Sequence, residues 1–448
     1  MTKQLELPFS FRSESPSAKR SEQAPTATGG NEGPGASDLM ERVASRPNLQ
    51  AALKRVKKNK GSPGIDGMTV EKLPDWLKAN WREVREQLLT GHYQPQPIKG
   101  QMIPKRGGGE RELGIPTVLD RFIQQALLQV LQPQFDPTFS NHSHGFRPGR
   151  RAHDAVREAQ KYIQDGRRWV VDVDLEKFFD RVHHDVLMGK LAKRIGDKRV
   201  LGLIRRYLEA GVMASGVVVK RYEGTPQGGP LSPLLGNVLL DEVDQELENR
   251  SHAFVRYADD CNVYVRSQRA AERVMRLLRK LYSRLRLQIN ETKSAVARAC
   301  SRKFLGFAFW VAPGKQIRRR VHHKSLCAMK DRIRHITRRI RGRSLEQVAA
   351  DLKAYLVGWK NYFRLADTPN VFRNLDKWIR HRLRALQLKH WKQGPTIFRE
   401  LRARGLSAEQ AGKVAGNFRS WWRTSAKLIH HALPNSLFDE LGVPRLAA

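Results

Sequence analysis

Two adjacent aspartates, Asp259 and Asp260, separate two short apolar runs in the segment FVRYADDCNVYV, residues 254–265. The flanking β-branched and aromatic residues predict strands, and the small polar residues between them predict a tight turn. Two neighbouring carboxylates repel each other unless a cation neutralises them, and Mg²⁺ prefers carboxylate oxygens. Paired metal ions promote in-line displacement at phosphorus. A solvated Asp-Asp turn with no ligand would show the same local pattern.

A second acidic segment, WVVDVDLEKFFD at residues 169–180, supplies a third carboxylate. Its first residues predict a buried strand, and Asp174 falls where that strand ends. A polymerase metal site needs three carboxylates from two separate strands, and Asp174, Asp259 and Asp260 meet that requirement. Asp172 is the competing candidate for the upstream position.

The two segments together resemble the palm of the reverse transcriptases that group II introns encode. In that family the YADD tetrad and an aspartate shortly before FFD carry the metal site, and both occur here, as YADD at 257–260 and DLEKFFD at 174–180. The family's ribose-gating aromatic lies five residues beyond the aspartate. Phe179 fills that position for Asp174, whereas Asp172 would place Lys177 there, so we prefer Asp174.

The resemblance implies a catalytic and metal-binding triad of Asp174, Asp259 and Asp260. Two Mg²⁺ ions would be held there, with Mn²⁺ as a possible substitute. It also implies that Phe179 contacts the incoming nucleotide and excludes the ribose 2′-hydroxyl. The expected activity is RNA-directed DNA polymerisation, a nucleotidyl transfer.

The elements that must position this triad follow in the family's order. Residues 96–131 predict a fingers hairpin followed by a helix, with a glycine turn at 107–109. Lys105 and Arg111 flank the turn and are expected to bind the triphosphate as a point charge and a fork. A solvated basic hairpin is the alternative.

Two more nucleotide contacts are expected from family motifs. Gln227 lies in PQGGPLSP, which matches the PQGxPxSP motif that borders the nucleotide and the template base. Lys293 lies where related polymerases keep a lysine near the leaving pyrophosphate, although an exposed loop lysine is equally compatible with its sequence. The segment KFLGFAF at 303–309 matches the family's primer-grip hairpin.

An arginine cluster in HGFRPGRRAHDAV, residues 144–156, matches the family's second fingers motif. Arg147, Arg150 and Arg151 are expected to reach the template backbone. Pairing of one of these arginines with Asp154 is the alternative.

The overall charge favours nucleic acid as the partner. Lys and Arg total 82 against 44 Asp and Glu, a net charge of +38. Dispersed cations favour phosphate neutralisation. No run approaches the roughly 18 apolar residues of a spanning helix, and no apolar signal core opens the chain. The three cysteines show no CxxC spacing, so no disulfide framework or zinc site is supported. We expect a cytoplasmic protein with no membrane partner.

The C-terminal third changes character. Apolar residues recur at a spacing of 3–4 across 325–341, with cations between them, which predicts an amphipathic helix. Arg334, Arg338 and Arg341 are expected to bind nucleic acid. Calmodulin-target and membrane-surface helices share this pattern. The segment YLVGWKNYFRL at 355–365 resembles the maturase region of group II intron proteins.

The predicted fold class is α+β, a right-hand polymerase followed by helices. The predicted parts are a disordered leader (1–37), an N-terminal helical extension with a basic, glycine-containing loop (38–83), reverse transcriptase fingers and palm (84–310), an α-helical thumb and maturase domain (311–400), and a small, possibly DNA-binding unit (401–448). The paired cysteines and histidines of the endonuclease that the family often appends are missing, so we expect no such domain.

The expected function is RNA-directed DNA polymerisation combined with binding of intron RNA for splicing and mobility. Its partners would be intron RNA as template, a DNA primer or target, and deoxynucleoside triphosphates. One alternative is an RNA-binding splicing cofactor with dispensable polymerase activity. Another is a reverse transcriptase recruited to defence or repair, with no intron.

Overall fold

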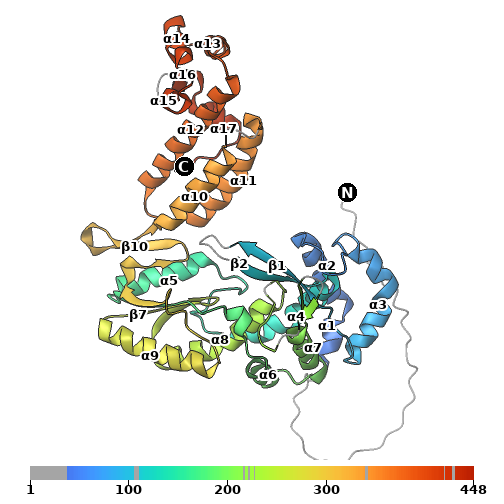
Figure 1. Ribbon diagram of the computed structural model, residues 1–448. Coiled ribbons are helices and arrows are strands. Elements are labelled where there is room, and N and C mark those ends of the chain that lie inside the picture. Colours follow the sequence, from blue (N-terminus) through green and yellow to red (C-terminus); the bar gives the residue numbers. More distant parts are fainter. Residues whose placement is uncertain are drawn as a thin grey trace, which may run out of the picture. The chain divides into compact units, whose positions relative to one another are not determined.

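The computed structural model describes residues 38–104, 110–214, 217–219, 222–226, 228–338, 342–417, 419–425 and 429–447 (Figure 1). The predicted leader, 1–37, lies outside these residues. The chain divides into two compact units. The first holds residues 1–151 and 169–296, and the second holds 152–168 and 297–448.

The first unit opens with three helices, α1 (Leu39–Val43), α2 (Arg46–Asn59) and α3 (Leu73–Leu89). The predicted fingers hairpin follows as β1 (Ile98–Pro104) and β2 (Glu110–Ile115), which pair antiparallel. β1 also pairs in parallel with β4 (Val212–Ala214), which continues to β5 (Val217–Val219). The strand order of this sheet is β2-β1-β4-β5.

A second sheet carries both acidic segments. Its strand order is β6-β7-β3-β8. These strands are β3 (Trp169–Val173), β6 (Ala253–Tyr257), β7 (Asp260–Val265) and β8 (Ala295–Arg298), and the division between the units falls inside β8. The predicted hairpin at 254–265 is confirmed, because β6 and β7 pair from Ala253↔Tyr264 to Tyr257↔Asp260. α9 (Gln268–Arg284) packs on β3 and β7, and α8 (Ser232–Asn249) packs on β6.

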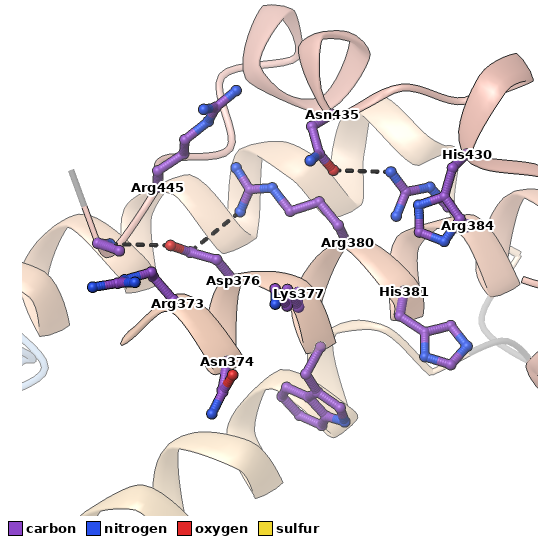
Figure 2. Close-up of a pocket in the computed structure, with 12 residues that line it drawn as sticks. Arg373, Asn374, Asp376, Lys377, Arg380, His381, Arg384, His430, Asn435 and Arg445 are labelled. Atoms are coloured by element: carbon purple, nitrogen blue, oxygen red, sulfur yellow. Dashed lines mark hydrogen bonds and ion pairs between the residues drawn. The ribbon is translucent and has the colours of Figure 1, made fainter. Parts of the chain in front are cut away.

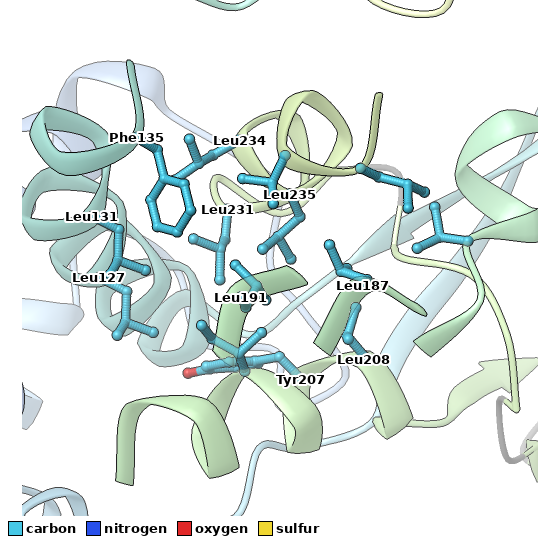
Figure 3. Close-up of a cluster of buried hydrophobic side chains, with 14 of the residues drawn as sticks. Leu127, Leu131, Phe135, Leu187, Leu191, Tyr207, Leu208, Leu231, Leu234 and Leu235 are labelled. Carbon is cyan, nitrogen blue, oxygen red and sulfur yellow. The ribbon is translucent and has the colours of Figure 1, made fainter. Parts of the chain in front are cut away.

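Helices supply the hydrophobic core beside this sheet. α4 (Val118–Phe135), α6 (His184–Ala192), α7 (Lys198–Glu209) and α8 turn apolar side chains of helical spacing toward one another. Figure 3 shows part of this cluster, which includes Leu127, Leu131, Phe135, Leu187, Leu191, Tyr207, Leu208, Leu231, Leu234 and Leu235. Each is buried, and full burial of one such side chain stabilises the fold by about 1.5–3 kcal/mol.

The second unit combines a small sheet with helices. α5 (Ala152–Gln164) packs on β11 (Ile317–Val321), since Gln160 Nε2 donates to the carbonyl of Ile317 at 2.6 Å. β10 (Phe307–Val311) lies between β9 (Lys303–Phe304) and β11. This second unit therefore includes part of the segment predicted as fingers and palm, 84–310. The two boundaries differ because a compact unit is defined by which elements pack together, and a division of the linear sequence does not contain that information.

The amphipathic helix predicted at 325–341 is shorter in the structure. α10 runs over His323–Ile336. At its C-terminal end, the Thr337 hydroxyl and the Thr337 N–H both donate to the carbonyl of Ile333, at 2.7 and 2.9 Å. Arg338 therefore follows the helix, and Arg341 lies outside the described residues.

The helices after α10 begin as their sequences indicate. α11 (Leu345–Phe363) opens with a complete capping box between Ser344 and Gln347, as predicted. α12 (Pro369–Trp391) has proline in its first turn. Five further helices follow: α13 (Gly394–Ala403), α14 (Ala408–Gly416), α15 (Trp421–Thr424), α16 (Ile429–Ala432) and α17 (Asn435–Glu440). Among the described helices, none is both long and apolar enough to cross a bilayer.

Candidate active site

The end of β3 brings Asp174 to the tip of the β6–β7 hairpin. β3 pairs antiparallel with β7, and Val173, its last residue, lies opposite Cys261. Asp174 follows, at the level where the hairpin turns. The Asp174 N–H donates to Ser294 Oγ at 3.0 Å, and its carbonyl accepts from the Asn290 N–H at 2.9 Å. The loop before β8 thus fixes the backbone of Asp174.

Asp259 occupies the turn itself. Tyr257 and Asp260 are the last paired residues of the hairpin, so Ala258 and Asp259 make a two-residue connection. Ala258 has φ of +59°, a conformation that non-glycine residues seldom adopt and that stores strain. Neighbouring residues hold Ala258 in this conformation through a hydrogen bond to its carbonyl and close packing at its nitrogen.

The electrostatics of the turn indicate that Asp174 and Asp259 share one site. Burial raises the pKa of Asp259, and the negative charge of Asp174 raises it further, while Lys293 acts in the opposite direction. Lys293 Nζ lies 3.3 Å from Asp174 Oδ1. A buried carboxylate whose ionised form is disfavoured by a second carboxylate nearby suits a site for further positive charge.

Asp172 is placed differently. It lies in β3 opposite Asn262 and is buried, with 8% of its surface exposed. With its amide turned so that the nitrogen faces Asp172, Asn262 donates to Asp172 Oδ1 at 2.9 Å. This carboxylate is satisfied inside the sheet, which favours Asp174 for the upstream role.

A buried ion pair stabilises the turn that carries Asp259. The side chains of Arg256 and Asp244 are both 0% exposed, and Arg256 Nη2 lies 2.5 Å from Asp244 Oδ2. Arg256 Nη1 donates to the carbonyl of Ala258 at 3.0 Å and to Asn237 Oδ1 at 2.9 Å. α8, which carries Asp244 and Asn237, is thereby tied to the strained residue beside Asp259.

The segment 142–146 closes the other side of the turn. The His144 N–H donates to the Arg256 carbonyl, and the Arg256 N–H donates to the His142 carbonyl, both at 2.9 Å. A Cβ on Gly145 would lie 2.2 Å from the Ala258 nitrogen, so only glycine fits there. Phe146 follows with φ of +60° and an exposed ring, a second strained residue next to the turn.

Phe179 lies in a short 3₁₀ helix, Phe178–Arg181, just after Asp174. Its carbonyl accepts from the Thr225 N–H at 2.6 Å. A Cβ on Gly236 of α8 would lie 3.6 Å from the Phe179 ring, and Phe178 packs edge-on against that ring. The half-buried ring is thus held between α8 and the end of β3.

Three of the predicted binding residues lie outside the described residues, namely Lys105, Gln227 and Arg341. Arg111 is in β2 opposite Ile103.

The prediction that Arg147 binds the template backbone is not supported by its position. Its side chain is 3% exposed and pairs with Asp136 at 2.8 Å. Its Nη1 also donates to the carbonyls of Ser140 and Ser143, at 2.5 and 3.0 Å. Arg147 therefore stabilises the loop that leads to Gly145, a role that its motif alone does not reveal.

The remaining arginines are accessible to different degrees. Arg150 donates to the Asn141 carbonyl at 2.6 Å and to Asn141 Oδ1 at 2.8 Å. Arg334 pairs with Asp331 at 2.6 Å on the exposed side of α10, and Arg338 is exposed. Exposure of Arg334 and Arg338 is compatible with the predicted nucleic-acid contact.

Within the described part of the chain, no three His, Cys, Asp or Glu side chains already converge as a metal site. Asp174 and Asp259 nevertheless fit a hard divalent cation, because both are oxygen donors and the charge of Asp174 disfavours the ionised form of Asp259. Asp260, at the start of β7, is the neighbouring carboxylate. Sequence reasoning found these aspartates but missed Arg256, Asp244 and Asn237, for which burial is the only signal.

Comparisons with known proteins agree with this geometry. A family model described as reverse transcriptase (RNA-dependent DNA polymerase) matches residues 103–309, and one described as group II intron, maturase-specific domain matches 326–405.

Two curated relatives match about half of the chain. Protein YkfC of Escherichia coli (strain K12) is 38% identical over 216 residues, 47% of this chain and 57% of YkfC. The group II intron-encoded protein LtrA of Lactococcus lactis subsp. cremoris is 36% identical over 213 residues, 46% of this chain and 34% of LtrA. The chain thus aligns with less than two thirds of either relative.

A solved structure titled "Partial Cas6-RT-Cas1--Cas2 complex" is 25% identical to the chain, with a TM-score of 0.36. It matches 55% of this chain and 42% of that chain.

The Arg256–Asp244 pair yields a test of stability. Arg256→Met should lower the free energy of unfolding by about 3–5 kcal/mol, because Asp244 is left buried and unpaired. The double variant Arg256→Met/Asp244→Leu should recover most of that loss, since no charge then remains in the core. Urea denaturation followed by circular dichroism measures both.

Arg250→Met is the matched control. Arg250 follows α8, the helix that carries Asp244, and makes an exposed ion pair with Glu246 of that helix at 2.6 Å. It should cost less than about 1 kcal/mol. A double variant as unstable as Arg256→Met alone would show that Asp244 is not the reason for the loss.

Proposed function

The chain belongs to the family of group II intron-encoded reverse transcriptases and maturases, and on that premise we propose that it is an RNA-directed DNA polymerase that also binds intron RNA. The observation that carries the polymerase proposal is the convergence of Asp174 and Asp259 at the junction of β3 and the β6–β7 turn, with Lys293 Nζ 3.3 Å from Asp174. The substrates would be an RNA template, a DNA primer and deoxynucleoside triphosphates.

The reaction is nucleotidyl transfer. The primer 3′-hydroxyl loses its proton and attacks the α-phosphorus, a new P–O bond forms, and the bond to pyrophosphate breaks. Mg²⁺, or Mn²⁺ in its place, would polarise the phosphate and stabilise the developing charge. Asp174, Asp259 and Asp260 would hold the metal ions, and the strained turn fixes Asp259 before substrate binds.

Lys293 has two roles in this proposal. Without substrate, its ammonium partly neutralises Asp174. With a nucleotide bound, the same exposed and flexible side chain would contact the departing pyrophosphate. Lys105, Arg111 and Gln227 complete the proposed nucleotide contacts, and Arg150 is the proposed contact to the template.

Phe179 is the proposed selectivity residue. Its ring lies beside Gly236 of α8 and packs edge-on against Phe178, with 5.0 Å between the ring centroids. A rigid aromatic wall offers a ribose 2′-hydroxyl neither space nor a hydrogen-bond partner. Deoxyribonucleotides would be selected for that reason.

The maturase part of the proposal concerns the second unit. Binding of intron RNA by the helices from α10 to α12 would assist splicing and mobility of a group II intron, with exposed cations such as Arg334 and Arg338 contacting phosphates. Service as a splicing cofactor with an idle polymerase remains the rival hypothesis, and the paired carboxylates of the first unit argue against it.

The polymerase proposal is tested by Asp259→Asn. We expect primer extension on poly(rA)/oligo(dT) with Mg²⁺ to fall by roughly a hundredfold or more, as when a group that stabilises transition-state charge is removed. Asp185→Asn is the control, because Asp185 is an exposed carboxylate on α6. Full activity in Asp259→Asn, or none in the wild type with either Mg²⁺ or Mn²⁺, would refute the assignment.

Selectivity is tested by Phe179→Ala. Ribonucleotide incorporation relative to deoxyribonucleotide should rise by about tenfold or more, corresponding to at least about 1.4 kcal/mol of lost discrimination. Phe179→Tyr keeps the ring and should keep the exclusion. If the ratio of the two kcat/KM values is unchanged in Phe179→Ala, the gate is another residue.

A further inference from the structure

A basic pocket of about 890 Å³ lies in the second unit, between α12 and the segments that follow it in the chain (Figure 2). Its cationic lining residues are Arg373, Lys377, Arg380, Arg384 and Arg445, whereas Asp376 is the one carboxylate among the described lining residues. The four cations of α12 recur at spacings of three and four residues, which places them on one face of the helix.

Arg384 lies deepest. It is 2% exposed; its Nε donates to the Leu433 carbonyl at 2.8 Å, and its Nη2 donates to Asn435 Oδ1 at 2.9 Å. Among the described residues no carboxylate pairs with it. Burial, and to a smaller extent the neighbouring charge of Arg380, lowers the pKa of Arg384 to about 10. The guanidinium still carries its proton at neutral pH, so a buried positive charge faces the pocket without an anion.

The acidic side chains around the pocket are already engaged. Arg380 pairs with Asp439 at 2.9 Å and with Asp376 at 3.5 Å. Asp439 also pairs with Arg445 at 2.5 Å, and Asp376 accepts from the Leu446 N–H at 2.9 Å. These contacts fasten the C-terminal segment to α12, and they leave Arg373, Lys377 and Arg384 as the positive charge available to a ligand.

An aromatic pair adjoins this charge. The ring of His381, which lines the pocket, stacks on Trp422 with 3.7 Å between ring centroids, and Trp422 is 43% exposed. Arginines that bind phosphate beside an exposed aromatic ring are the combination that recognises a polynucleotide strand, in which phosphates and bases alternate.

We propose that this pocket binds phosphate groups of an RNA strand, with Arg384 at its base and Arg373 and Lys377 at its wall. The identification of the strand as RNA rests on the proposed maturase function, whereas the affinity for phosphate follows from the lining alone. A free phosphate anion has the same chemistry and is the alternative source.

The test measures binding of single-stranded oligo(rU) to the full chain across a series of salt concentrations. Arg384 also connects α12 to Leu433 and Asn435, so the variant used is Arg373→Gln/Lys377→Gln, which changes only exposed side chains. Each lost phosphate contact should reduce the slope of log Kd against log salt by about 0.7, so the double variant should have a slope shallower by about 1.4.

Lys392→Gln/Arg399→Gln is the matched control. It removes the same charge from exposed positions that do not line the pocket. Its slope should remain that of the wild type. Equal slope changes in the two variants, or none in the pocket variant, would overturn the proposal.

Inorganic phosphate at constant ionic strength separates the two sources of phosphate. If the strand is the ligand, phosphate should compete with oligo(rU) for the wild type more strongly than for the pocket variant. If phosphate raises the Tm of the wild type alone while both proteins keep the same RNA slope, the pocket binds a free anion and the strand assignment is wrong. Failure of the polymerase proposal would appear as a wild type that is inactive in primer extension, independently of the slopes.

Discussion

The buried pair of Arg256 and Asp244 is the interaction on which the active-site turn depends. Taking two charges out of water is unfavourable, and the pair persists only because further hydrogen bonds satisfy the guanidinium. Two of those bonds go to Asn237 and to the Ala258 carbonyl. Because one of these bonds joins Arg256 to Ala258, the buried pair fixes the position of the residue that precedes Asp259.

That fixed position matters because the site concentrates negative charge. Asp174 reaches the turn from β3, and its presence raises the pKa of Asp259 beyond the effect of burial. Left free, a hairpin tip would separate the two carboxylates. The Arg256 network, the close approach of Gly145 and the bonds from Asn290 and Ser294 together prevent this, so the site is arranged for cations before they bind.

The sequence predicted what local patterns encode. The hairpin at 254–265, the fingers strands and the capping box at Ser344 all follow from periodicity or turn chemistry. Burial was not predictable, because it is a tertiary property. Arg147 was expected to bind the template backbone and is buried in the loop that leads to Gly145, and no local pattern marks Arg256 as half of a buried ion pair. The helix predicted at 325–341 ends at Ile336 in the structure. The charged pocket on α12 requires residues 430–447 beside the helix, an arrangement that spacing within α12 does not contain.

The central claim is that Asp174 and Asp259 form one metal-binding unit at the ends of two paired strands. Asp172, in contrast, accepts a hydrogen bond from Asn262 within the sheet and holds no metal ion. The most direct measurement is the rate of single-nucleotide incorporation under single-turnover conditions for Asp174→Asn and Asp172→Asn, each compared with the wild type. The account predicts a loss of roughly a hundredfold or more for Asp174→Asn and of less than about tenfold for Asp172→Asn, whose amide can still pair with Asn262. A loss in Asp172→Asn as large as that in Asp174→Asn would contradict it.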